Sequence, residues 1–138
     1  MPSWTLPTSD CRDKLEEYMQ ALPLEEVDFV VLFGSAARGQ GGELDILIGL
    51  HSDGKSRFID RLQLWSGLGP GVKALPYYPA ELTLMREQLH LVLLDAADHG
   101  HTLFDRGVWQ ELRRDLRENA PVERIPGGGW KVVTRHAS

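Results

Sequence analysis

The sequence contains very little cysteine, and this limits how the chain can be stabilised. Cys11 is the only cysteine among 138 residues, so no disulfide can form within the chain. A chain of this length can bury a hydrophobic core without cross-links. Sparse cysteine is typical of proteins kept in reducing compartments, and we therefore expect a cytoplasmic protein.

Long hydrophobic runs are also missing. No apolar stretch approaches the roughly 20 residues that a membrane-spanning helix needs. The N-terminal residues 1–4, Met-Pro-Ser-Trp, have neither the basic nor the apolar region of a signal peptide. With 42% hydrophobic and 25% charged residues, the composition is typical of a soluble globular domain, and we expect no membrane among its partners.

Positive charge is in deficit. The chain has 15 lysines and arginines against 20 aspartates and glutamates, which gives a net charge of −5. Proteins that grip a nucleic-acid backbone need clustered basic residues, so a nucleic-acid partner is disfavoured. The one basic cluster, Arg113, Arg114 and Arg117, is explained more simply as the solvated face of a helix with i,i+4 ion pairs, although a phosphate contact is the alternative.

Hydrophobic spacing predicts helices alternating with strands. Helices are expected over residues 10–21, 55–65, 79–99 and 107–119, and strands over 27–33, 44–50, 72–77 and 101–104. This order predicts an α/β (α+β) layer fold in one domain, residues 1–120. Residues 121–138, which contain the run Pro-Gly-Gly-Gly, are interpreted as a loosely attached tail. The alternative is that the segment 130–134 adds an edge strand or binds a partner.

One stretch of the chain combines a small turn with two carboxylates. An apolar run ends at Gly34 and Ser35, and Glu43 and Asp45 open the next apolar run. Because residues i and i+2 of a strand point to the same side, the two carboxylates should face one way while Leu44 faces the other. Carboxylates beside a turn with free backbone N–H groups suit a divalent metal and a polyphosphate.

These residues resemble the minimal nucleotidyltransferase family, within the DNA polymerase beta superfamily, of which the chain would be a divergent member. The family carries Gly-Ser followed by Ala-Arg-Gly and then a strand with Asp-x-Asp, and here residues 34–39 read Gly-Ser-Ala-Ala-Arg-Gly and residues 43–45 read Glu-Leu-Asp. Residues 77–82 are similar to the family's Thr-Pro-x-Glu helix opening. Residues 100–105 are similar to its helix-to-strand ending.

The resemblance implies a nucleotidyltransferase-like mixed sheet with helices packed mainly on one face. It also implies a chemistry in which Mg²⁺ ions clamp a nucleoside triphosphate and activate an acceptor hydroxyl. Carried over to this sequence, Gly34, Ser35 and Arg38 would bind the nucleotide. Glu43 and Asp45 would hold the metal and be catalytic.

The sequence departs from the family in three ways. Glu43 replaces the first Asp, which moves that carboxyl outward by about 1.5 Å. The loop over residues 36–42 is shorter than the family's usual loop. Active members place a third acid on the following strand, but no Asp or Glu occurs from Leu62 to Ala80, and the matching position is most plausibly Lys73, which would repel a metal and could pair with Glu43 or Asp45.

Two functions follow from this resemblance. The first is transfer of a nucleoside monophosphate, expected to be AMP, from a triphosphate to a hydroxyl with Mg²⁺. The second is a degenerate member that binds a nucleotide or a partner, as an antitoxin does beside an all-helical HEPN protein. A nucleic-acid binder that uses the tail and the Arg113 cluster is a third and weaker hypothesis, and a homodimer is compatible with so small a domain.

Overall fold

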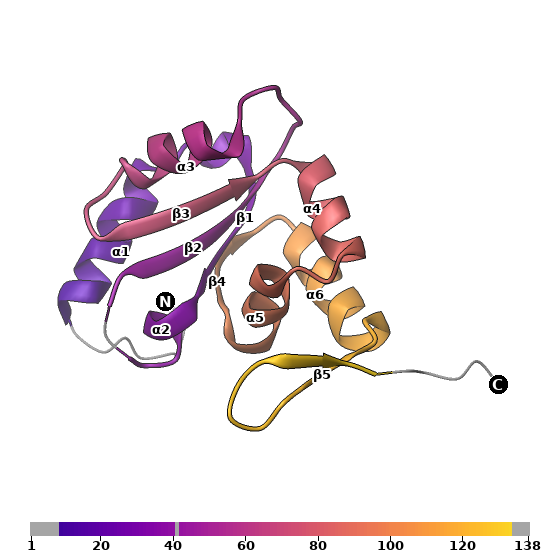
Figure 1. The fold of residues 1–138 in the computed structure, drawn as a ribbon. Coiled ribbons are helices and arrows are strands. Elements are labelled where there is room, and N and C mark those ends of the chain that lie inside the picture. The colour runs from indigo at the N-terminus through magenta and orange to yellow at the C-terminus, as the bar shows by residue number, and fades with distance from the viewer. Residues whose placement is uncertain (1–8, 41, 134–138) are drawn as a thin grey trace.

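The computed structural model describes residues 9–40 and 42–133, and Figure 1 shows its helices and strands along the chain. The helices are α1 (Ser9–Ala21), α2 (Gly34–Ala37), α3 (Phe58–Ser66), α4 (Pro79–Glu87), α5 (Leu91–His99) and α6 (Val108–Asn119), with a 3-10 turn η1 (Leu24–Glu26). The strands are β1 (Val27–Phe33), β2 (Leu44–Leu50), β3 (Val72–Tyr77), β4 (His101–Asp105), β5 (Val122–Arg124) and β6 (Trp130–Val132). Within the described residues, no helix has the length and hydrophobicity to cross a bilayer.

The main sheet is mixed and has four strands in the order β3-β2-β1-β4. β1 runs antiparallel to both of its neighbours, β2 and β4, and β3 runs parallel to β2. Figure 1 shows α4, α5 and α6 on one side of this sheet, α1 on the other side, and α3 beside β3. The predicted fold class, an α/β (α+β) mixed sheet with packed helices, is confirmed.

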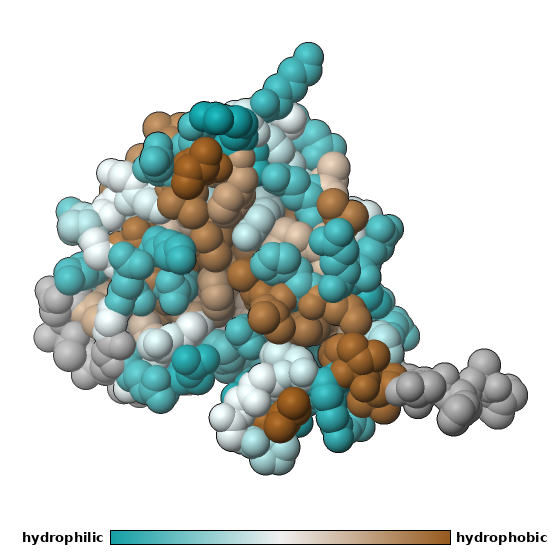
Figure 2. Space-filling view, in the orientation of Figure 1, coloured by the Kyte–Doolittle hydropathy of each residue, from teal (hydrophilic) through white to brown (hydrophobic). Residues whose placement is uncertain are grey.

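Each face of the sheet packs against its own hydrophobic core. Side chains of β1 and β2 alternate between the two cores, as the pleat of a strand requires. Ile46 packs with Tyr18 of α1 on one face, and Leu47 packs with Leu93 of α5 on the other. Figure 2 shows brown hydrophobic atoms along the recess beside the sheet, with hydrophilic side chains around it. Because both faces are covered, β1 and β2 read as nearly continuous apolar runs in the sequence.

A glycine in the central strand pair makes room for an aromatic ring. Phe29 of β1 lies opposite Gly49 of β2, and its ring occupies the space where a side chain at position 49 would stand. The same ring packs against Trp109 of α6, with ring centroids 5.3 Å apart. Because position 49 has no side chain, the Phe29 ring fits against β2 and also contacts Trp109 of α6.

The single helix predicted over residues 79–99 is wrong in its middle. The chain leaves the helix after α4, because Leu89 adopts a positive φ of 53°, and α5 begins anew after His90. The His90 imidazole caps α5 by accepting a hydrogen bond from the Val92 N–H (3.2 Å), so His90 is not the mid-helix residue that the spacing indicated. Both helices pack on the same core, so the hydrophobic spacing continues through the break and hides it.

The segment predicted as a tail forms a hairpin over its described residues, up to 133. β5 and β6 pair antiparallel, and the glycines between them, Gly127–Gly129, all have positive φ. The Trp130 indole N–H donates to Asp95 of α5 (2.9 Å), and Arg124 forms an ion pair with Asp98 of the same helix. The glycine run is thus a turn, and the segment 130–132 pairs with β5 and not with an edge of the main sheet. The boundary between a domain of 1–120 and a tail of 121–138 stays a prediction.

We expect Gly49→Ala to destabilise the protein. A Cβ at this position would come within 2.1 Å of the Phe29 ring, so the ring must move in a close-packed core, at a cost of about 1–3 kcal/mol. Urea unfolding measures this cost as a lower midpoint with an unchanged slope. In a Phe29→Leu background the added cost should shrink, because the ring is absent. Equal costs in the two backgrounds would contradict this explanation.

Candidate functional site

The glycine-serine turn lies directly after the central strand. β1 ends at Phe33, and Gly34 starts the short helix α2 with a φ of +77°. A Cβ added at Gly34 would lie 2.4 Å from Asp45 Oδ2, so the carboxylate rests against the backbone of the turn. Only glycine permits both this backbone conformation and this close approach.

Asp45 holds its place through the register of the sheet. It pairs with Phe33 of β1 on one side and with Lys73 of β3 on the other. Burial raises the pKa of Asp45, the positive charges of Lys73 and Arg38 lower it, and the charge of Glu43 raises it. The half-buried carboxylate therefore stands between one acidic and two basic neighbours.

The predicted alternation of side chains occurs in β2. Leu44 and Ile46 belong to the core under α1, whereas Asp45 lies on the opposite side of the strand, which it shares with Leu47. Glu43 precedes β2 and is exposed. Of the two predicted carboxylates, Asp45 is held within the sheet, whereas Glu43 lies one residue before the first residue of β2.

Two histidines that the sequence did not assign to the site hold α2 from the other side. The Gly34 N–H donates to His99 Nε2 (2.9 Å), and the Arg38 guanidinium Nη1 lies 3.5 Å from the same nitrogen. His101 Nε2 lies 2.9 Å from the Ala37 carbonyl oxygen at the end of α2. The pair His-x-His was visible in the sequence, but nothing in it indicated a contact with a turn 65 residues away.

The contact with Gly34 fixes the tautomer of His99. Because Nε2 accepts a hydrogen bond, the proton of the neutral ring is on Nδ1, which lies 3.7 Å from Asp98 Oδ2, outside hydrogen-bond distance. Burial lowers the pKa of His99, and Arg38 lowers it further, against smaller opposing effects of Asp95 and Asp98. His99 is therefore neutral near pH 7, and it occupies one backbone donor of the turn that a phosphate would otherwise use.

Lys73 is the residue of β3 that lies beside Asp45. The parallel register of β2 and β3 makes it the direct neighbour of Asp45, as the alignment by sequence predicted. Over the described residues, no three His, Cys, Asp or Glu side chains gather in a way that could hold a metal ion. Glu43 and Asp45, opposed by Lys73 and Arg38, do not fit a two-metal centre, which requires carboxylates around both ions.

The motif at residues 77–82 has a structural function in this chain. Glu81 accepts a hydrogen bond from the Tyr78 N–H (2.7 Å) at the start of α4 and forms an ion pair with Arg61. Arg61 is 4% exposed, donates to the Pro76 carbonyl (3.2 Å) and stacks 3.9 Å from the centre of the Tyr78 ring. This buried guanidinium joins α3 to the end of β3 and thereby fixes the strand that carries Lys73.

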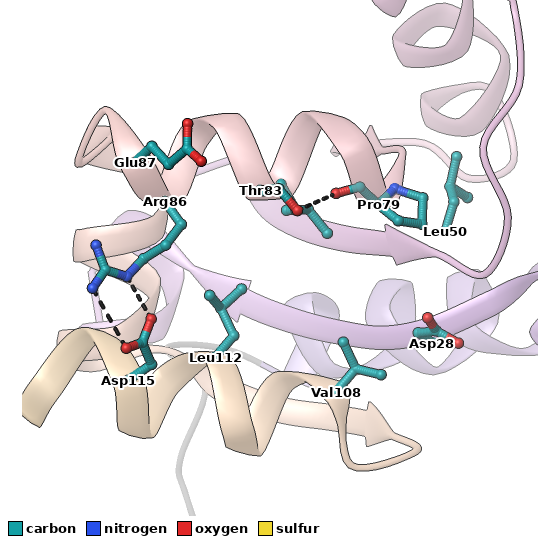
Figure 3. Close-up of a pocket in the computed structure, with 10 residues that line it drawn as sticks. Asp28, Leu50, Pro79, Thr83, Arg86, Glu87, Val108, Leu112 and Asp115 are labelled. Atoms are coloured by element: carbon teal, nitrogen blue, oxygen red, sulfur yellow. Dashed lines mark hydrogen bonds and ion pairs between the residues drawn. The ribbon is translucent and has the colours of Figure 1, made fainter. Parts of the chain in front are cut away.

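A groove of about 580 Å³ lies between α4 and α6 (Figure 3). Its apolar walls include Leu82 and Leu112, and an ion pair between Arg86 Nε and Asp115 Oδ2 (2.5 Å) links the two helices across it. None of the residues predicted for the nucleotide site lines this groove.

Comparisons with known proteins do not show a family for this chain. No family model matches the chain, and no curated protein matches it by sequence. One similar solved chain belongs to the complex of a tri-AMPylated Shewanella oneidensis HEPN toxin with an MNT antitoxin. The match covers 80% of this chain and 82% of that chain, with a TM-score of 0.45 and 11% sequence identity.

We expect His99 to make stability depend on pH. Its folded-state pKa is lowered, whereas the unfolded side chain titrates at about 6.5. Below that pH the unfolded chain binds a proton that the folded chain does not, so the free energy of unfolding falls as pH drops. In His99→Gln, whose amide oxygen can still accept from Gly34, the fall from pH 7 to pH 5 should be shallower, by at most about 1.4 kcal/mol per pH unit.

The control is His90→Asn, which removes an exposed histidine and keeps a capping acceptor. Urea unfolding across the pH range measures both variants. An unchanged pH dependence in His99→Gln, or an equal change in His90→Asn, would contradict the assignment.

Proposed function

We propose that this protein is a nucleotidyltransferase-like protein that binds a nucleoside triphosphate without a metal ion and does not transfer it. The observation that carries the proposal is the register pair of Asp45 and Lys73. By the resemblance to the family, Lys73 takes the position of the third metal-binding acid, and its ammonium group would supply to a triphosphate the positive charge that a metal supplies.

The charges around the turn support this assignment of roles. Arg38 at the end of α2 and Lys73 on β3 both act electrostatically on Asp45, so the three groups lie within interaction range of one another. A triphosphate beside Gly34 and Ser35 would meet these two cations. A guanidinium and an ammonium are the side chains that proteins use to bind phosphate.

Transfer of AMP to a hydroxyl acceptor with Mg²⁺ is the competing function. In its favour, the Asp45 carboxylate lies against Gly34, as the resemblance to the family requires. Against it, such transfer needs metal ions that clamp both the attacking and the leaving oxygen, and the described residues offer two carboxylates opposed by two cations. Binding without transfer is therefore the function that the site supports better.

A HEPN-type helical partner and a homodimer both stay predictions. The first comes from the resemblance of residues 34–45 to the family. The solved complex of toxin and antitoxin has too low a TM-score to carry a partner over to this chain.

We expect ATP to bind in the presence of EDTA, with an affinity that depends on the two charges at the register pair. Asp45→Asn removes the repulsion between this carboxylate and the triphosphate, which is about 1 kcal/mol. ATP binding should therefore tighten about fivefold. Lys73→Gln should weaken it by a similar factor, and Lys55→Gln, an exposed lysine outside the site, should leave it unchanged. Isothermal calorimetry measures these affinities. Binding that requires Mg²⁺, is lost in Asp45→Asn and is accompanied by transfer of labelled AMP would instead establish the enzyme.

Lys73→Asp should restore affinity for divalent metal. The substitution places a third carboxylate beside Asp45 and Glu43 and removes the opposing cation. We expect Mn²⁺ binding, measured by the relaxation of water protons, to become at least tenfold tighter than in the parent protein. Lys73→Asn, which removes only the cation, is the matched control. Equal Mn²⁺ affinity in the Asp and Asn variants would contradict the assignment of this position.

A further inference from the structure

Three arginines lie together on the face of α6 that borders β4. They line a groove of about 500 Å³ that also reaches Thr102 of β4. The three arginines, Arg113, Arg114 and Arg117, share this groove with two carboxylates, Asp105 of β4 and Glu118 of α6. Asp105 is occupied in capping α6, where it accepts from the Gly107, Trp109 and Gln110 N–H groups.

Two of these arginines are held side by side. Arg113 Nε and Arg117 Nη2 both donate to the Ala97 carbonyl oxygen, each at 3.1 Å, near the end of α5. Burial and the neighbouring charge of Arg117 lower the pKa of Arg113. In the described part of the chain, the ion pairs of arginine involve Arg57, Arg61, Arg86 and Arg124 and none of the three in the groove. The groove therefore holds three arginines against two carboxylates, a positive excess on a protein whose net charge is −5.

The strand beside this groove is an edge of the sheet. β4 is the last strand in the order β3-β2-β1-β4, and within the described residues its one strand partner is β1. Over residues 102–105, no second strand of the described chain pairs with the outer edge of β4. An edge of this kind is a template for pairing with another chain.

We propose that this groove binds an acidic, extended segment of another protein, which pairs with the outer edge of β4 and places its carboxylates against the arginines of α6. Backbone hydrogen bonds to β4 supply the direction and register of the segment, and the guanidinium groups select its charge. The inference concerns residues outside the Gly34–Asp45 site and does not depend on the proposed nucleotide function.

Two other occupants fit less well. A second copy that paired through its own β4 would bring two sets of three arginines together, and like charges so placed repel. A nucleic acid would meet the arginines, but its sugar-phosphate backbone cannot continue a β-sheet. An acidic strand uses both the free edge and the charge.

The proposal is tested with a fluorescein-labelled peptide of five Glu-Thr repeats, measured by fluorescence anisotropy on the full chain. We expect binding that weakens several-fold between 20 and 300 mM NaCl, because the charges are solvent-accessible. The double variant Arg114→Gln/Arg117→Gln should bind about tenfold more weakly. A peptide of five Lys-Thr repeats should not bind.

Two controls separate strand pairing from simple attraction of charge. The double variant Arg12→Gln/Arg57→Gln removes the same charge from α1 and from the residue before α3, and should bind like the parent protein at 300 mM NaCl. A Glu-Thr peptide with N-methyl groups on alternate residues loses backbone donors along one edge and should bind at least tenfold more weakly. No binding of the unmodified peptide, equal loss in the two arginine double variants, or equal binding of the methylated peptide would each overturn the proposal.

Discussion

The antiparallel register of β1 and β2 governs the geometry of the candidate site. Because Phe33 pairs with Asp45, the residue after Phe33 must lie beside the Asp45 side chain, and only a glycine fits there. The register is fixed by burial on both faces, since a slip by one residue would exchange the two cores. The position of the carboxylate is thus a consequence of packing far from it.

The same sheet places a lysine, and not a carboxylate, beside Asp45. The register of the parallel pair β2 and β3 makes Lys73 the direct neighbour of Asp45, and the buried Arg61 donates to the Pro76 carbonyl near the C-terminal end of β3. A half-buried carboxylate has two means of stabilisation, a bound cation or a cationic side chain. In this chain the cationic side chains are Lys73 and Arg38. Burial raises the pKa of Asp45 by more than these two positive charges lower it.

Much of the fold could be predicted from hydrophobic spacing. The strands β1, β2 and β3 occur at the predicted residues, because strands buried on both faces leave long apolar runs. The break at Leu89 could not be predicted, because leucine is a good helix former and the spacing continues on both sides of it.

The hairpin over residues 122–132 was also missed. Its attachment depends on Asp95 and Asp98 of α5, which are remote in sequence and give no local signal.

The sequence by itself determined the order of the elements, the glycine-serine turn and the lack of a third acid between Leu62 and Ala80. These are local properties, carried by side-chain type and spacing. Only the tertiary structure decided that His99 binds the turn and that the arginines of α6 line a groove beside the outer edge of β4. Each of these contacts joins residues far apart in the chain, and no pattern within a short window of sequence can encode which distant elements pack together.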